Sequence, residues 1–328
     1  MPKKIRVGFI GCGGISNGHA NRLKNIPEAR ITALMDVDAG SLTRFQQAHS
    51  ETRDCPVFRD HQEMLEKAEL DAVEIHSPHT VHFQQIMDAL DRGLHVLVEK
   101  PMVCKVEHAK QVIEKAEKVG TVVLVSYQRH YQPEFRYIKE QIASGNLGAV
   151  QFVSALQCQD WYRSQQGKWR QDPALSGGGQ LNDSGSHLVD VILWTSGLRV
   201  SEVSGYIDNL DTAVDINSAL SLKFDNGGQG NISIVGNGPT FWEDVTFCGL
   251  EGSIFHRRGK LFQQQLGGEL FEPTDLPAGP ASADANFIQA ILGREEVQCL
   301  PEDGLRVIEL TEAAWESGKT GCPVKVAR

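Results

Sequence analysis

The glycine-rich turn near the start of the chain restricts the fold more than any other feature. A strand-like run from Ile5 to Ile10 leads directly into Gly11-Cys12-Gly13-Gly14-Ile15-Ser16, and a helical pattern follows. This order is typical of the first strand-turn-helix unit of a dinucleotide-binding sheet. Gly11 would allow a tight turn, and Gly13 would let backbone N–H groups approach a pyrophosphate. A plain strand-to-helix turn would also accommodate these glycines.

An acidic residue after the second apolar run favours the dinucleotide interpretation. The run from Ile31 to Met35 ends on Asp36, about 25 residues after Gly11 and close to the usual spacing of about 20. A carboxylate there accepts hydrogen bonds from the adenosine ribose of NAD. It would repel the 2′-phosphate of NADP by about 4 kcal/mol per charge pair at ~4 Å and an effective dielectric constant of about 20. NAD is therefore predicted in preference to NADP, although Arg44 is a nearby cation that could accommodate a phosphate.

Composition limits the classes of partner. The chain has 328 residues, enough for two domains with separate cores, and a formal net charge of −10. Nucleic acids and anionic membranes require a basic surface, and no cluster of lysine and arginine is present, so we expect neither partner. No apolar run approaches the roughly 20 residues of a membrane helix, and Met1-Pro2-Lys3-Lys4 does not resemble a signal peptide. We therefore expect a cytoplasmic protein.

The first part of the chain alternates between strand and helix patterns. Such alternation predicts a parallel sheet with helices on both faces, with the dinucleotide at the carboxyl ends of the strands. We assign residues 1–126 to this Rossmann domain. The expected strands lie near 5–10, 31–35, 71–76, 95–98 and 121–126, with helices that include 41–49, 79–92 and 105–119.

The remaining residues, 127–328, form the second predicted domain. A long series of strands here predicts a largely antiparallel sheet, and the turn sequence Asp225-Asn226-Gly227-Gly228 separates two of the strands. The expected elements are helices near 132–143, 183–195, 283–292 and 302–317, and strands near 150–157, within 200–265 and around 324.

The first candidate catalytic group is at the end of a strand of the first domain, in Val98-Glu99-Lys100-Pro101. A lysine beside a redox site can donate a hydrogen bond to the reacting oxygen and, with a lowered pKa, exchange protons. The alternative is an ordinary surface lysine paired with Glu99.

The second group is the segment from Ser176 to Asp190, which contains Gly177-Gly178-Gly179. The glycines would let the backbone approach a ligand closely. Asp183 and His187 are four residues apart, so we expect them on one helical face, where the carboxylate could orient the imidazole for proton transfer. The alternative is a helix N-cap aspartate and a histidine that belongs to the core.

Together the glycine turn, the Glu99-Lys100-Pro101 triplet and the Gly177 to His187 segment resemble the Gfo/Idh/MocA family, named for glucose-fructose oxidoreductase and inositol dehydrogenase. The likeness covers nearly the whole chain. It implies an α/β fold with an N-terminal Rossmann dinucleotide-binding domain. It also implies a C-terminal α/β domain with an open-faced, largely antiparallel mixed sheet, which binds substrate and assembles the chain into a homodimer or homotetramer.

The resemblance also implies roles for individual residues. Lys100, Asp183 and His187 would be catalytic. The residues expected to contact the cofactor are Gly11, Gly13, Gly14, Ile15, Asp36, Ser77, Pro78, Glu99, Lys100 and Gln128.

One departure from the family pattern affects the expected site. His79 stands where asparagine is frequent, which creates His76-x-x-His79-x-x-His82. This spacing could bind a metal on one helical face, but His76 ends a strand and Pro78 interrupts the path, so we expect no metal and place His82 near the cofactor or at a helix start. The seven cysteines are scattered and form no Cys-x-x-Cys pair, which indicates reduced thiols.

These observations lead to a hypothesis of reversible, NAD-dependent oxidation of a secondary hydroxyl on a sugar or cyclic polyol. His187 would take the hydroxyl proton, Asp183 would orient the imidazole, and Lys100 would bind the substrate oxygen while a hydride passes to the nicotinamide. The polar aromatic loop from 157 to 170 would form a substrate wall through Asp160, Trp161 and Tyr162, unless its tryptophans only pack in the interior.

Two other functions are compatible with the same residues. A glycosidase or lyase could use tightly bound NAD to oxidise its substrate transiently, and would release sugar without net NADH. A nucleotide-sensing protein on the same fold is the third possibility, but it would not need Lys100, Asp183 and His187 together.

Overall fold

The computed structural model describes residues 4–327 and divides the chain into two compact units. The first unit comprises the residues up to Val103, Glu107–Gln128 and Pro280–Glu302. The second comprises Cys104–Val106, Arg129–Gly279 and the residues from Asp303 onward. The sequence-based division at residues 126 and 127 differs from this mainly in Pro280–Glu302, which returns to the first unit.

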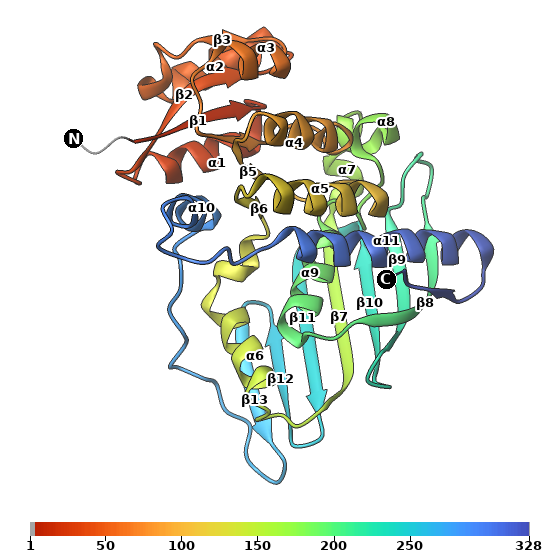
Figure 1. The fold of residues 1–328 in the computed structure, drawn as a ribbon. Helices are drawn as coiled ribbons and strands as arrows, with labels where there is room; N and C mark the ends of the chain where they lie inside the picture. The colour runs from red at the N-terminus through yellow and green to blue at the C-terminus, as the bar shows by residue number, and fades with distance from the viewer. Residues whose placement is uncertain (1–3, 328) are drawn as a thin grey trace. The chain divides into compact units, whose positions relative to one another are not determined.

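The first unit contains a six-stranded parallel sheet with the order β3-β2-β1-β4-β5-β6 (Figure 1). This is the order of a doubly wound dinucleotide-binding sheet, in which ligands bind at the carboxyl ends of the strands. The five predicted strands are present, and β3 is an addition of only two residues. The strands are β1 (Ile5–Ile10), β2 (Ala29–Met35), β3 (Val57–Phe58), β4 (Ala72–Ile75), β5 (His95–Val98) and β6 (Val123–Val125).

The helices of this unit connect the strands and cover the sheet. Ten-residue helix α1 follows the glycine turn directly, and α10 from the returning segment contacts α1, β5 and β6. Helix α10 thus belongs to the first unit and not to the second predicted domain. The helices are α1 (Gly14–Leu23), α2 (Ala39–Ala48), α3 (His61–Lys67), α4 (His82–Asp91), α5 (Val106–Val119) and α10 (Ala283–Ile291), with short 3-10 turns η1 (Ser50–Thr52), η2 (His79–Val81) and η3 (Gln128–Tyr131).

The second unit contains an eight-stranded sheet with the order β13-β12-β11-β7-β10-β9-β8-β14. Strand β7 pairs parallel with β10, and every other pairing is antiparallel. The mixed sheet confirms the predicted fold class. The strands are β7 (Val150–Asp160), β8 (Val200–Asp208), β9 (Asn217–Phe224), β10 (Gln229–Val235), β11 (Asn237–Gly249), β12 (Gly252–Arg257), β13 (Lys260–Gln265) and β14 (Val324–Lys325).

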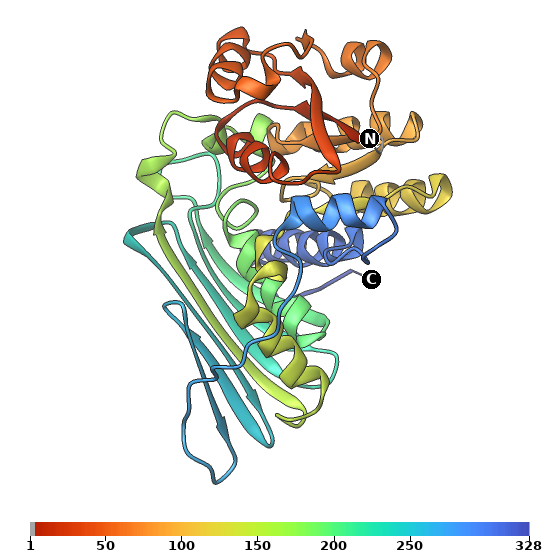
Figure 2. The ribbon, with the colours of Figure 1, turned by 90° about the vertical axis from the view of Figure 1, so that its left-hand side faces the viewer.

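One face of this sheet is covered by helices and the other is open. Figure 2 shows α6, α9 and α11 against the same face of the sheet. Strand β9 alternates accordingly, with Leu220 and Leu222 buried and Lys223 exposed. A period of two is the pattern of a strand with one buried face. The helices of this unit are α6 (Pro133–Ala143), α7 (Trp161–Ser164), α8 (Pro173–Ser176), α9 (Gly185–Ser196) and α11 (Pro301–Thr320), with the 3-10 turn η4 (Trp169–Gln171).

Within residues 4–327, no helix combines the length and the apolar character that crossing a membrane demands.

The alternation of β9 can be tested with two leucines. Leu222 is 3% exposed and Leu266, in the turn after β13, is 77% exposed. Leu222→Ala should lower the free energy of unfolding by about 2–5 kcal/mol because it leaves a cavity, whereas Leu266→Ala should change it by less than about 0.5 kcal/mol. Urea denaturation followed by circular dichroism measures both, and equal effects would contradict the described burial.

Candidate active site

Glycine occupies the three positions of the first turn for different structural reasons. Gly11 has a φ of +95°, and a Cβ there would lie 2.8 Å from the carbonyl carbon of His76, so the fold itself demands glycine. Apart from chain neighbours and the backbone of α1 itself, a Cβ on Gly13 or Gly14 would meet no atom of residues 4–327 within 4 Å. Gly13 has a φ of −84°, which any residue adopts. The protein's own packing therefore does not explain the last two glycines.

The start of α1 is open to a ligand. Gly13 is the N-cap residue, and among the described residues no side chain caps the helix there. The first N–H groups of a helix have no partner within the helix and carry a partial positive charge. Backbone N–H groups beside side-chain-free residues are the arrangement that binds phosphate groups at helix N-termini. The residues present therefore fit the pyrophosphate of a dinucleotide.

Asp36, at the end of β2, is connected to the glycine turn. Its Oδ2 accepts a hydrogen bond from the backbone N–H of Cys12 at 2.8 Å, and its Oδ1 accepts one from Asp38 at 2.8 Å. An ionised carboxylate offers about four acceptor positions, so capacity remains for ribose hydroxyls. Arg44 forms a pair with Asp38 at 3.2 Å. Burial, with Asp36 nearby, raises the pKa of the Cys12 thiol to about 12, which makes it unreactive.

The turn residues after β4 and β5 are linked to each other through His82. Its Nδ1 is 2.9 Å from the carbonyl oxygen of Pro101, and its Nε2 is 2.9 Å from that of Ser77. The ring is fully buried at the start of α4, so its described role is to join the two loops. Ser77 donates from its hydroxyl to Gln85 at 2.5 Å. Gln128, in contrast, is exposed at the start of η3.

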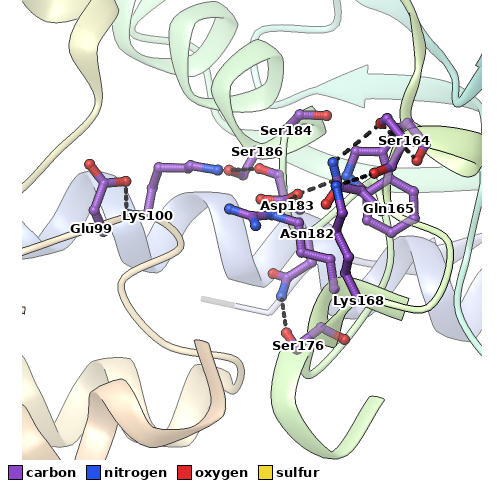
Figure 3. A network of polar contacts seen from close by, with 12 residues as sticks. Glu99, Lys100, Ser164, Gln165, Lys168, Ser176, Asn182, Asp183, Ser184 and Ser186 are labelled. Carbon is purple, nitrogen blue, oxygen red and sulfur yellow. Dashed lines mark hydrogen bonds and ion pairs between the residues drawn. The ribbon is translucent and has the colours of Figure 1, made fainter. Parts of the chain in front are cut away.

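Glu99 of the Glu99-Lys100-Pro101 triplet belongs to a largely buried network of charged groups. His19 Nε2 is 2.9 Å from Glu99 Oε1, and His19 Nδ1 is 2.8 Å from Asp284 Oδ1. Arg22 forms an ion pair with the other oxygen of Asp284. Glu99 also accepts the backbone N–H of Lys100 at 3.3 Å (Figure 3).

The pKa values of the groups in this network depend on one another. Burial lowers the pKa of His19, but its hydrogen bonds with Asp284 and Glu99 outweigh burial and raise it to about 10. For the carboxyl of Glu99, burial alone would raise the pKa. The hydrogen bond and charge of His19 outweigh burial and hold the pKa of Glu99 well below its usual range. Glu99 is therefore an anion directly behind the backbone of Lys100.

In the second unit, the glycines of the 177–179 run pack against protein. A Cβ on Gly178 would lie 2.5 Å from the Trp315 ring, and one on Gly179 would lie 2.0 Å from the carbonyl oxygen of Asp215. Close packing thus explains Gly178 and Gly179, in place of the close ligand approach expected from the sequence. Gly177 ends α8 with a φ of +68°.

The buried Asp215 carboxylate holds the loop around Gly179 in place through hydrogen bonds. Its carboxylate accepts hydrogen bonds from the backbone of Gly179 at 2.9 Å and Leu181 at 2.7 Å, and from the Trp315 indole at 2.9 Å. Burial raises the pKa of Asp215, which indicates how far the group is removed from water. No motif in the sequence indicated this residue.

Asp183 lies in the turn before α9, since that helix begins at Gly185 and not at Asp183 as predicted. Its Oδ2 accepts hydrogen bonds from the Trp161 indole at 2.8 Å and from Arg170 Nε at 2.9 Å. His187 is half-buried in the first turn of α9. Figure 3 shows Asp183 beside Asn182, whose amide donates to the carbonyl oxygen of Ser176 at 3.4 Å.

The predicted substrate loop divides into a buried and an accessible part. Trp161 is 3% exposed and packs with Val214 and Ile216, so its visible role is to support Asp183. The Tyr162 hydroxyl donates to Asp211 at 2.6 Å, and Asp160 pairs with Arg163 at 3.4 Å.

Two cavities are formed by residues of the second unit. One of about 550 Å³ has Tyr162, Lys168, Trp169 and Asp211 among its lining residues. Another of about 790 Å³ is lined mainly by residues of η3, α6, β11 and β12, including Arg129 and Glu243, which form an ion pair.

Comparison with protein-family models matches both parts of the chain. A model described as an oxidoreductase family with an NAD-binding Rossmann fold matches residues 5–127. A second, the GFO/IDH/MocA C-terminal domain, matches residues 135–255.

Characterised relatives and solved structures agree with these matches. The scyllo-inositol 2-dehydrogenase (NAD(+)) of Bacillus subtilis (strain 168) is 26% identical over 78% of this chain and 74% of its own. The D-glucoside 3-dehydrogenase of Escherichia coli (strain K12) is 24% identical, in a match that covers 98% of this chain and 97% of the relative. The WlbA dehydrogenase from Bordetella pertussis, crystallised with NADH and UDP-GlcNAcA, has the same fold with a TM-score of 0.86, at 21% identity over 100% and 99%.

The role of Asp215 predicts a specific loss. In Asp215→Asn an amide N–H₂ faces N–H donors, so the free energy of unfolding should fall by about 2–3 kcal/mol. Asp275→Asn, at an exposed loop position, is the matched control and should behave as the unaltered protein. Urea denaturation followed by tryptophan fluorescence compares them, and coincident curves would show that Asp215 does not support the loop.

Proposed function

This chain belongs to the GFO/IDH/MocA family of NAD-binding oxidoreductases, and we propose that it is an NAD-dependent dehydrogenase of a secondary hydroxyl on a sugar or cyclic polyol. The observation that carries the proposal is the open start of α1, where Gly13 and Gly14 leave room that the protein's own side chains do not use. The named activities of the inositol and glucoside dehydrogenases support the substrate class.

The cofactor would be held at the carboxyl ends of the first unit's strands. The N–H groups around Gly13, Gly14 and Ile15 would bind the pyrophosphate, and Asp36 would accept hydrogen bonds from the ribose. Ser77, Pro78, His82, Glu99 and Gln128 follow the other strands at the same sheet edge and remain proposed contacts, with His82 acting through the loops that it joins. NAD, when bound, supplies the acceptor for the hydride.

NAD is the proposed cofactor in preference to NADP. Asp36 would hold its carboxylate beside the 2′-phosphate of NADP, and the two like charges would repel. The pairing of Arg44 with Asp38 supports this choice, because the nearby cation already has an anionic partner.

Three side chains have proposed chemical roles. Lys100 would donate a hydrogen bond to the substrate oxygen and stabilise its developing negative charge, and Glu99, kept ionised by His19, would fix the backbone behind it. His187 would accept the hydroxyl proton as general base. Asp183 would favour the protonated form of His187. Trp161 and Arg170 donate hydrogen bonds to the Asp183 carboxylate and keep it in one orientation.

The cavity of about 550 Å³ is the proposed location for part of the carbohydrate. Tyr162 and Trp169 offer aromatic faces for C–H groups, and Lys168 and Asp211 offer hydrogen bonds to hydroxyls. Asp160, at the end of β7, remains a proposed contact, and Trp161 would contribute through Asp183.

Assembly and location are further parts of the proposal. The open sheet face exposes large side chains, with Phe152 39% and Tyr206 85% accessible, which supports a homodimer or homotetramer formed through this face. All seven cysteines are free thiols, which supports function in a reducing compartment such as the cytoplasm.

A substrate panel tests the proposal. Sugars, inositols and their keto forms would be incubated with NAD and NADP in parallel, with nicotinamide absorbance as the readout. We expect net NADH from at least one carbohydrate and a smaller kcat/KM with NADP. Sugar release without net NADH would instead identify the NAD-assisted glycosidase or lyase, and no turnover in either cofactor would overturn the proposal.

Variants of the proposed catalytic residues should separate chemistry from cofactor binding. Lys100→Ala and His187→Ala should each lower kcat by about 10²- to 10⁴-fold and weaken NAD binding far less. Lys105→Ala, at an exposed position nearby, is the control. A folded variant that loses NAD binding in proportion to kcat would contradict the assigned role.

A further inference from the structure

Inside the first unit, a carboxylate and an imidazole are buried without hydrogen-bond partners. Glu74 on β4 is 0% exposed, and His76 follows that strand at 8%. Among residues 4–327, neither oxygen of Glu74 and neither ring nitrogen of His76 has a hydrogen bond. Buried polar groups are nearly always paired, and an unpaired one in a native protein calls for an explanation such as an ion.

A second imidazole completes a three-residue group. Glu74 Oε2 is 3.4 Å from His76 Nε2 and 3.6 Å from His19 Nδ1, and one ligand atom from each residue lies within 4.8 Å of the others. These separations exceed the usual hydrogen-bond range of about 2.7–3.2 Å. Two ligands at about 2.1 Å from a tetrahedral metal ion are about 3.4 Å apart. The spacing therefore suits a shared ion better than direct hydrogen bonds.

The surroundings of His19 suit a metal ligand. Its Nε2 is 2.9 Å from Glu99, which matches the carboxylate that commonly accepts the second N–H of a metal-bound histidine. Asp284 Oδ1, 2.8 Å from the ligating nitrogen, is a further oxygen at the same position. Metal binding would displace the Nδ1 proton that His19 shares with Asp284 in the metal-free protein. With His19 then neutral, a divalent cation balances the two negative charges that Glu74, Glu99 and Asp284 carry in excess of Arg22.

We propose that His19, Glu74 and His76 bind one divalent first-row transition-metal ion of the Zn²⁺ type. Two imidazole nitrogens and a carboxylate favour this class over Ca²⁺ and Mg²⁺, which prefer all-oxygen sites. None of these residues is a proposed catalytic residue, and of the His76-x-x-His79-x-x-His82 spacing considered in the sequence only His76 belongs to this group.

The ion would have a structural role. The backbone of His76 lies against Gly11, because a Cβ on Gly11 would lie 2.8 Å from the carbonyl carbon of His76. Helix α1 contributes His19, and Asp284 connects the group to α10. An ion here would join the glycine turn to two helices, so its loss should weaken the whole first unit.

The competing occupant is a proton. Burial raises the pKa of Glu74 to about 8, and burial lowers the pKa of His76. A protonated Glu74 could therefore share its proton with a neutral His76 and leave no metal requirement.

Metal analysis of the untagged protein distinguishes the two occupants, without substrate or NAD. Protein from cells grown with Co²⁺ in place of Zn²⁺ should contain about one Co²⁺ per chain and show a visible d–d absorption band, because binding is coupled to folding. Glu74→Gln, which mimics the protonated carboxyl in shape, should lose the ion and the band. His61→Gln, which alters a histidine–carboxylate pair elsewhere in the unit, should keep both.

Thermal denaturation adds a second readout. The proposal expects a lower midpoint in Glu74→Gln than in the Co²⁺-loaded protein. His76→Gln removes a different ligand and should reproduce the loss if Glu74→Gln fails to fold. Absence of stoichiometric metal from the unaltered protein, or equal metal in Glu74→Gln, would overturn the proposal. Because metal content is measured without turnover, this outcome is independent of the proposed dehydrogenase activity.

Discussion

The uncapped start of helix α1 is the constraint on which the rest of the first unit depends. Glycine inside a helix costs roughly 1 kcal/mol relative to alanine, and Gly14, the first residue of α1, relieves no contact within 4 Å with described residues beyond its chain neighbours and its own helix. The N-cap Gly13 likewise relieves no contact beyond its chain neighbours. The helix therefore begins less stably than it could, and leaves its N–H groups accessible. Gly11 and Asp36 fix the position of this turn through His76 and the Cys12 N–H. A phosphate-binding turn accounts for this combination.

The second unit uses glycine for the opposite purpose. Gly178 and Gly179 are required because Trp315 and the Asp215 backbone occupy the space where a Cβ would lie. The tight packing fixes the turn that presents Asp183. Trp161 and Arg170 then orient its carboxylate from a loop that was expected to contact substrate directly. The candidate chemistry of this unit thus rests on buried hydrogen bonds.

Local patterns in the sequence predicted much of the fold. The five predicted strands of the first sheet and the glycine turn follow from short-range apolar runs and spacing, whereas β3, with two residues, is too short to produce a pattern. The return of α10 could not be predicted, because the contact of Asp284 with His19 joins residues 265 positions apart. Asp215 was missed for the same reason. Spacing alone also does not distinguish glycines that pack from glycines that leave room for a ligand.

Calorimetric titration of NADH into the unaltered protein and into Gly13→Val tests the central claim most directly. The valine side chain enters space that the described protein leaves open, so the variant should fold normally. It should nevertheless bind NADH about 100-fold more weakly, a loss of about 2.7 kcal/mol. An unaltered protein that does not bind NADH, or a folded variant that binds it equally well, would contradict the account.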